Sequence, residues 1–183
     1  MKTRILPKTF VTPIVVLASL MLLLLAVLRG GIGTPTVLAA VGVPGTYELS
    51  FCADGVPIGS TLFVGQELTL HAYVADSSGT PASSGYVVFQ VCTRGGRAIP
   101  NDPQPSSACD VDHTASWVSL AFPKLTVDGT TCLGCLPAGP GNACLGYGVV
   151  QSTRTVGFRF KYFGQGSGIA NGIATKDVTW ILP

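Results

Sequence analysis

The sequence predicts an all-β sandwich of antiparallel strands that is exported from the cytoplasm. Three observations favour this fold class. Apolar and polar residues alternate in several segments after residue 40, and no segment there has a convincing helical period. Glycine (23 residues) and proline (13 residues) interrupt the 183-residue chain often, as short strands joined by turns require. All six cysteines lie after residue 40, and an even number is typical of a disulfide-bonded exported domain.

The first 40 residues have the pattern of a secretory signal or a membrane anchor. A basic head precedes residues 10–28, which carry no charge. The length of this apolar run lies between that of a signal core and that of a bilayer-spanning helix. Ala39 and Ala40 end a small-residue stretch that slightly favours cleavage. We expect an apolar signal or anchor helix over 1–40, which would be the chain's one contact with a membrane, and an exported domain over 41–183.

Seven or more short strands are expected in the exported domain. The segments with strand patterns are 45–52, 67–75, 86–92, 115–122, 124–129, 144–150, 155–163 and 174–182. Segments 115–122 and 124–129 predict either a strand pair or one bent strand. The side chains expected to face inward include Leu68, Leu70, Ala72, Val74, Val87, Phe89, Val91, Val118, Leu120, Phe122, Leu145, Tyr147, Val149, Val156, Phe158, Phe160, Tyr162, Val178, Trp180 and Leu182. Half-buried strands need a second sheet to cover their apolar faces, so the pattern predicts a sandwich.

Two stretches resemble bacterial immunoglobulin-like domains. In VGQELTLHAYVADSSGTPASSGYVVFQV, a strand ends in an acidic turn at Asp76, then come Pro81, a small-residue loop and the Gly85, Val87, Phe89 strand. TVGFRFKYFGQGSGIANG and KDVTWIL resemble the last two strands of that family. The resemblance implies an immunoglobulin-like sandwich that serves as a stalk, spacer or adhesive module, without catalytic residues. The chain departs from antibody-type domains because no facing cysteines or intervening Trp join these strands.

The cysteines are expected to form structural disulfides in two long loops, 93–115 and 129–143. Cys92 and Cys109 bracket the first loop, which favours a bridge between them. Two of Cys132, Cys135 and Cys144 are expected to pair locally, and Cys52 would take the third. The alternative is a redox or zinc site built from Cys132, Cys135 and Cys144, with Cys109 or His113 as a fourth zinc ligand. The stretch LPAGPG after Cys135 disfavours the redox motif because it cannot form a helix.

Other constellations have weaker patterns. Asp110 and Asp112 could contribute to a calcium site, and with His113 to a hydrolase, but a solvated loop explains them as well. His71 occupies a polar-face position of a strand. The glycine-rich GQGSGIANG joins two strands rather than a strand and a helix, so Ser167 is not expected to be a nucleophile.

Charge and aromatic content limit the choice of partner. Residues 41–183 contain seven Lys/Arg and nine Asp/Glu, which disfavours nucleic acid. Aromatic residues with nearby arginines either form a binding face or cap the core: Tyr73, Tyr86, Trp117, Phe163 and Trp180. We therefore expect a non-catalytic domain outside the cytoplasm, with no cofactor or metal, that binds a protein or cell-surface ligand or has a structural role.

Overall fold

The computed structural model describes residues 42–95, 102–111, 115–120, 124–132, 134 and 137–183. Residues Ala40–Pro183 form one compact unit. The expected signal or anchor helix over 1–40 lies outside the described residues, as do Cys135, Asp112 and His113. Within the described part of the chain, no helix has the length and apolar character needed to cross a membrane.

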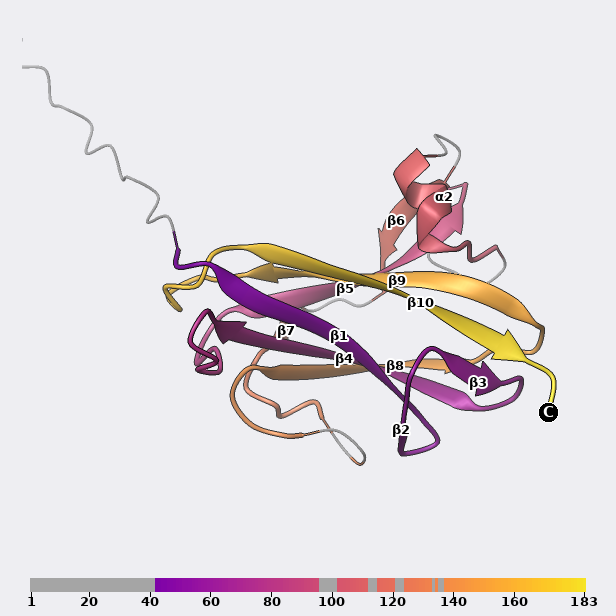
Figure 1. The fold of residues 1–183 in the computed structure, drawn as a ribbon, viewed down its shortest axis with the longest axis horizontal. Coiled ribbons are helices and arrows are strands. Elements are labelled where there is room, and N and C mark those ends of the chain that lie inside the picture. The colour runs from indigo at the N-terminus through magenta and orange to yellow at the C-terminus, as the bar shows by residue number, and fades with distance from the viewer. Residues whose placement is uncertain (1–41, 96–101, 112–114, 121–123, 133, 135–136) are drawn as a thin grey trace, which may run out of the picture. The chain divides into compact units, whose positions relative to one another are not determined.

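The described chain forms two mostly antiparallel sheets, which confirms the all-β prediction (Figure 1). The four-stranded sheet has the order β2 (Val56–Ile58), β1 (Gly45–Ala53), β4 (Glu67–Asp76) and β8 (Asn142–Val149). The six-stranded sheet has the order β3 (Thr61–Phe63), β10 (Gly172–Ile181), β9 (Arg154–Phe163), β5 (Tyr86–Arg94) and β6 (Ala115–Ser119), and β7 (Leu125–Thr126) also pairs with β5. The pairing of β3 with β10 is parallel, and every other strand pair is antiparallel.

The core lies between the two sheets, where the inward-facing residues of both sheets meet. On β4, Leu68, Leu70 and Val74 have no exposed surface, and on β9 Phe158 and Phe160 have none. Sandwich packing follows because each sheet covers the apolar face of the other. The predicted inward residues of these strands and of β5 are therefore confirmed.

Two predicted core residues are wrong, and both errors lie at strand ends. Val149 is 45% exposed because β8 contains a bulge. Thr69 of β4 pairs with Gly146, but the adjacent Leu68 pairs with Gly148, and the extra residue turns Val149 to the outer face. Leu182 is 69% exposed because β10 ends at Ile181. Trp180, one position before that end, is fully buried.

β4 and β5 are consecutive alternating strands, but they do not pair with each other. The loop between them carries the chain from the four-stranded sheet to the six-stranded sheet. Asp76 organises its start, because its carboxylate accepts hydrogen bonds from the backbone N–H groups of Ser78 (2.8 Å) and Thr80 (2.9 Å).

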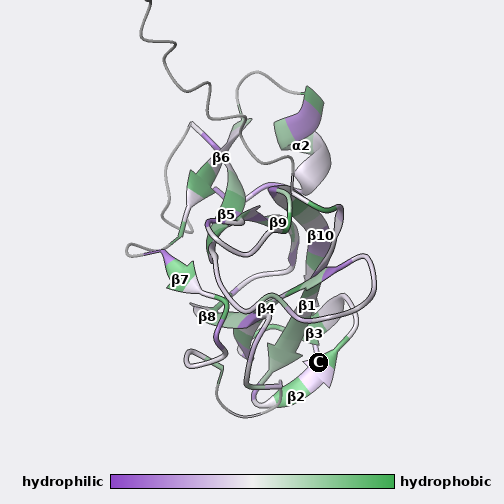
Figure 2. Ribbon diagram, turned by 90° about the vertical axis from the view of Figure 1, so that its left-hand side faces the viewer, coloured by the Kyte–Doolittle hydropathy of each residue, from purple (hydrophilic) through white to green (hydrophobic). Residues whose placement is uncertain are grey.

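The segments expected as a strand pair or a bent strand form one interrupted edge. β6 pairs with the end of β5, β7 pairs with its beginning, and β6 and β7 do not pair with each other. Phe122 lies outside the described residues. The loop 93–115 was expected to lack regular structure, but it contains the one-turn helix α2 (Ser106–Val111), which lies beside β6 at one end of the domain (Figures 1 and 2).

Candidate functional site

Disulfide bonds attach both long loops to the sheets. Cys92 of β5 is bonded to Cys109 of α2, with their Cα atoms 5.8 Å apart. Cys132 is bonded to Cys144 of β8, with their Cα atoms 4.8 Å apart. Both bonds fit the disulfide prediction. Cys52 is also disulfide-bonded, and none of the described cysteines is a free thiol.

The outer face of the four-stranded sheet is covered by the second long loop. Ser50 of β1, His71 of β4 and Cys144 of β8 are register partners, so their side chains form one row across this face. The loop joins the row through the Cys132–Cys144 bond and through a hydrogen bond from the Cys144 N–H to Thr131 Oγ1 (2.9 Å). His71 is consequently only 5% exposed, although its strand position is on the outer face.

Hydrogen bonds fix the tautomer of the buried His71 ring. Asn142 Nδ2 donates to the backbone oxygens of Gly139 (3.2 Å) and Pro140 (3.1 Å), so Asn142 Oδ1 is the atom that faces the ring. His71 Nε2 lies 2.7 Å from this oxygen and therefore donates its proton to it. His71 Nδ1 is then the acceptor, and it receives the hydroxyl hydrogen of Ser50 at 2.7 Å.

This network favours a neutral histidine that anchors the loop. Burial lowers the pKa of His71 below its usual value, while Asn142 and the charge of Glu48 oppose the shift. A pocket of about 350 Å³ opens beside the ring, lined by Glu48, Ser50, His71, Tyr73, Pro137 and Asn142. Serine donating to histidine is also the first contact of a nucleophile and its base. Here the ring's second partner is a neutral amide, which stabilises an imidazolium far less than a carboxylate does.

The disulfide beside His71 also bears on the metal alternative. The ligand atoms of His71, Cys132 and Cys144 all lie within 4.8 Å of one another. Zinc binds cysteine as thiolate, so the two sulfur atoms cannot both be thiolate ligands while they are bonded to each other. The zinc ligands expected from the sequence are not tested together, because Cys135 and His113 lie outside the described residues.

Several other predicted positions have structural surroundings. Asp110 lies on α2, where its carboxylate interacts electrostatically with Arg159 of β9. Ser167 lies in the turn between the paired strands β9 and β10, where its hydroxyl accepts a hydrogen bond from Tyr162 Oη (2.8 Å). The predicted hairpin is thus confirmed. Trp180 belongs to the core rather than to a binding face.

The outer face of the six-stranded sheet brings aromatic and cationic side chains together. We call it the aromatic face; its residues are Tyr86, Trp117, Lys124, Arg159, Lys161 and Phe163, all at least partly exposed. On β5 and β9 these positions alternate with fully buried core residues, so the rigid sheet directs them outward. The aromatic members were expected from the sequence, but Lys124 and Lys161 were not; Lys161 lies on the same strand as Phe163, and Lys124 comes from the segment before β7.

Two of the three aromatic rings on this face, Tyr86 and Trp117, are each in contact with a cation. Lys124 Nζ lies 4.1 Å from the Tyr86 ring centre. Phe163, the register partner of Tyr86 on β9, stacks on the Tyr86 ring with the ring centres 4.9 Å apart. The Arg159 guanidinium lies 4.4 Å from the Trp117 ring centre and donates to Gln90 Oε1 at 2.7 Å. Such cation–π contacts and stacks each contribute about 1 kcal/mol and favour the observed orientations of the rings.

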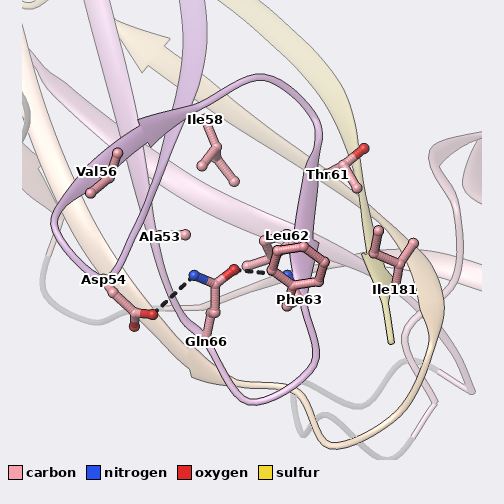
Figure 3. Close-up of a pocket in the computed structure, with 9 residues that line it drawn as sticks. All are labelled: Ala53, Asp54, Val56, Ile58, Thr61, Leu62, Phe63, Gln66 and Ile181. Atoms are coloured by element: carbon pink, nitrogen blue, oxygen red, sulfur yellow. Dashed lines mark hydrogen bonds between the residues drawn. The ribbon is translucent and has the colours of Figure 1, made fainter. Parts of the chain in front are cut away.

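A second hollow lies between β2 and β3, which are edge strands of the two sheets (Figure 3). It measures about 300 Å³, and Val56, Ile58 and Phe63 give it an apolar lining. Gln66 closes its polar side by donating to Asp54 Oδ2 (3.1 Å) and accepting from the Phe63 N–H (2.8 Å).

Comparison with known proteins identifies no family for this chain. No protein-family model matches it. No curated protein matches it. Among solved structures, the sporulation control protein Spo0M from Bacillus subtilis is similar, with a TM-score of 0.36 and 12% sequence identity. The similarity covers 75% of this chain and 50% of the Spo0M chain, so this chain spans half the length of that neighbour. A similarity of this size carries no functional argument, and the resemblance to immunoglobulin-like domains is not confirmed.

Proposed function

We propose that the chain is an exported immunoglobulin-like domain with a non-catalytic binding role at the cell surface or outside the cell. The observation that carries this proposal is the aromatic face, an outward-facing set of rings and cations on a rigid sheet. Aromatic and arginine side chains are enriched where proteins bind partners. We expect the role to be structural or adhesive, because binding through the outer face of a sheet requires no catalytic side chain.

Two further features support the proposal. The disulfides Cys92–Cys109 and Cys132–Cys144 are consistent with an oxidising compartment outside the cytoplasm. His71 is enclosed and holds a loop in place, which accounts for its hydrogen bonds without catalysis.

Cell fractionation tests the location, and enzyme assays test the absence of catalysis. The full chain, expressed with a C-terminal tag in an exporting bacterium, should be recovered outside the cytoplasm. Recovery in the cytoplasm would contradict the proposal. The purified chain should not hydrolyse ester or glycoside substrates. Hydrolysis that disappears in His113→Ala or Ser50→Ala would also contradict it.

The alternative is an exported redox or zinc protein that uses the cluster of Cys132, Cys135 and Cys144. The proximity of the His71 nitrogens to the sulfurs of Cys132 and Cys144 favours this second candidate. A thiol titration under native and denaturing conditions separates the two. The binding proposal expects no free thiols and no bound zinc, whereas six thiols or zinc recovered with the protein would favour the alternative.

A further inference from the structure

The aromatic face also contains a hollow that is suited to a single sugar unit. It measures about 180 Å³ and is lined by Lys161, Tyr162, Phe163, Asn171, Gly172 and Ile173. Apart from Asn171, which immediately precedes β10, these residues come from the ends of β9 and β10 that join in the hairpin, so paired strands hold them in place. The hollow is small compared with the pockets that hold drug-sized ligands, which favours one ring of a polymer over a larger compact molecule.

The side chains around this hollow offer three different kinds of contact. Phe163 presents an aromatic ring, whose face carries negative potential and attracts the C–H groups of a sugar. Asn171 supplies an amide, of which Oδ1 accepts from the Gly164 N–H (3.0 Å) and Nδ2 is left to donate. Ile173 is 53% exposed and adds apolar surface.

The ammonium group of Lys161 lies at this hollow and favours a negatively charged ligand. Within the described part of the chain, no carboxylate pairs with its ammonium group, although it lines the hollow. Arg159 precedes it by two residues on β9 and points to the same face, and Lys124 lies over Tyr86 on that face. Residues 41–183 have more acidic than basic residues. Three cations on one face are therefore a local concentration of positive charge that complements an anion, although Asp110 of α2 offsets part of it at Arg159.

We propose that the aromatic face binds an acidic polysaccharide, with one carboxylate-bearing sugar in the hollow beside Phe163 and Lys161. This inference rests on the proposed binding role and adds the ligand class. Nucleic acid is a poorer match because its backbone carries a dense row of charges, whereas this face has three separated cations among aromatic rings. An acidic polysaccharide supplies both the apolar sugar faces and a carboxylate on the sugar that lies in the hollow, which these residues match.

Binding to matched polymers tests the ligand class. The probes are polygalacturonate and its methyl ester, which share a backbone; esterification adds a methyl group to each carboxyl group and removes its negative charge. In affinity electrophoresis, we expect polygalacturonate in the gel to slow the migration of the full chain. Its methyl ester should slow it much less. Equal binding to both polymers, or tighter binding to single-stranded DNA or to anionic lipid vesicles, would overturn the proposal.

Variants locate the binding at the hollow. Lys161→Gln should weaken binding to polygalacturonate by about tenfold, which corresponds to the loss of one hydrogen bond to a charged group. Phe163→Leu should weaken binding to both polymers. The matched control is Lys176→Gln, which removes a cation from the opposite side of the same sheet, where its ammonium lies over Phe51. Circular dichroism should show that all three variants are folded.

The failures of the two proposals are distinguishable. Unchanged binding in Lys161→Gln and Phe163→Leu, or no binding to either polymer, would overturn the acidic-polysaccharide proposal alone. The chain would still be recovered outside the cytoplasm as an oxidised domain. Recovery in the cytoplasm with reduced cysteines would instead remove the proposed function.

Discussion

Single residues on the covered face of the four-stranded sheet show how a polar strand position became buried. His71 alternates with core residues and was expected on a polar face, which is correct for the strand. Its burial depends on Asn142 and on the loop before it, 71 residues later in the sequence. No local pattern indicates a contact at this separation. The cysteines were the available signal, since Cys144 lies next to His71 in register and Cys132 draws the loop over it.

The lowered pKa of His71 predicts that stability falls at mildly acidic pH. The unfolded chain has the ordinary histidine pKa of about 6.5, so it takes up a proton before the folded domain does. The free energy of unfolding should therefore be highest above pH 6.5 and decrease as pH falls through the folded pKa. Urea unfolding between pH 7 and pH 5 measures this, above the range where carboxylates titrate.

Two variants give this prediction its control. His71→Gln should remove the decrease between pH 7 and pH 5. Asn142→Asp should reduce or reverse it, because a carboxylate beside His71 Nε2 favours the protonated ring. A wild-type decrease that persists unchanged in His71→Gln would show that another group is responsible.

Gly141 is expected to be intolerant of substitution for two reasons. Its φ is +84°, a conformation that favours glycine, and an added Cβ would lie 2.6 Å from the Val74 backbone oxygen. The Gly139→Ala control has a positive φ as well, but its Cβ would meet no atom within 4 Å. We expect Gly139→Ala to cost about 1 kcal/mol of unfolding free energy through backbone strain, and Gly141→Ala to cost clearly more. Equal losses in thermal unfolding would contradict this assignment.

At the scale of elements, strand patterns predicted the central strands well and the edges poorly. β9 follows from four inward residues in alternation, Val156, Phe158, Phe160 and Tyr162, each buried as expected. β2 and β3 have three residues each, too few for a period-two pattern to be recognised. The bulge in β8 could not be predicted from the sequence pattern either, because it depends on how β8 pairs with β4.

The loop that covers His71 should depend on its disulfide. The bond joins residues separated by 12 positions, and closing a loop of that size stabilises by about 3 kcal/mol in the chain-entropy model. The double variant Cys132→Ser/Cys144→Ser should lose about that much unfolding free energy in urea. It should also increase amide hydrogen exchange at Asn142 and His71 more than in β9. Uniform exchange across the domain would indicate that the bond does not act locally.

At the scale of the molecule, two sheets supply a rigid frame, and disulfide-bonded loops complete it. The sequence predicted the two-sheet fold and the bridged loops because alternation and bracketing cysteines are local patterns. It did not predict the aromatic face as a whole, since Lys124 approaches Tyr86 only after β7 pairs with β5. Alternation predicted Trp180 to face inward, while its aromatic character also allowed a binding face, and its full burial confirms the inward position.

The disulfide bonds and the location outside the cytoplasm are tested together by the intact mass of the recovered protein. The mass of the chain collected from outside the cytoplasm is measured under denaturing conditions, before and after reduction. We expect reduction to add a pair of hydrogens for each bridge, with every cysteine engaged in a disulfide. A mass that does not change on reduction would contradict it.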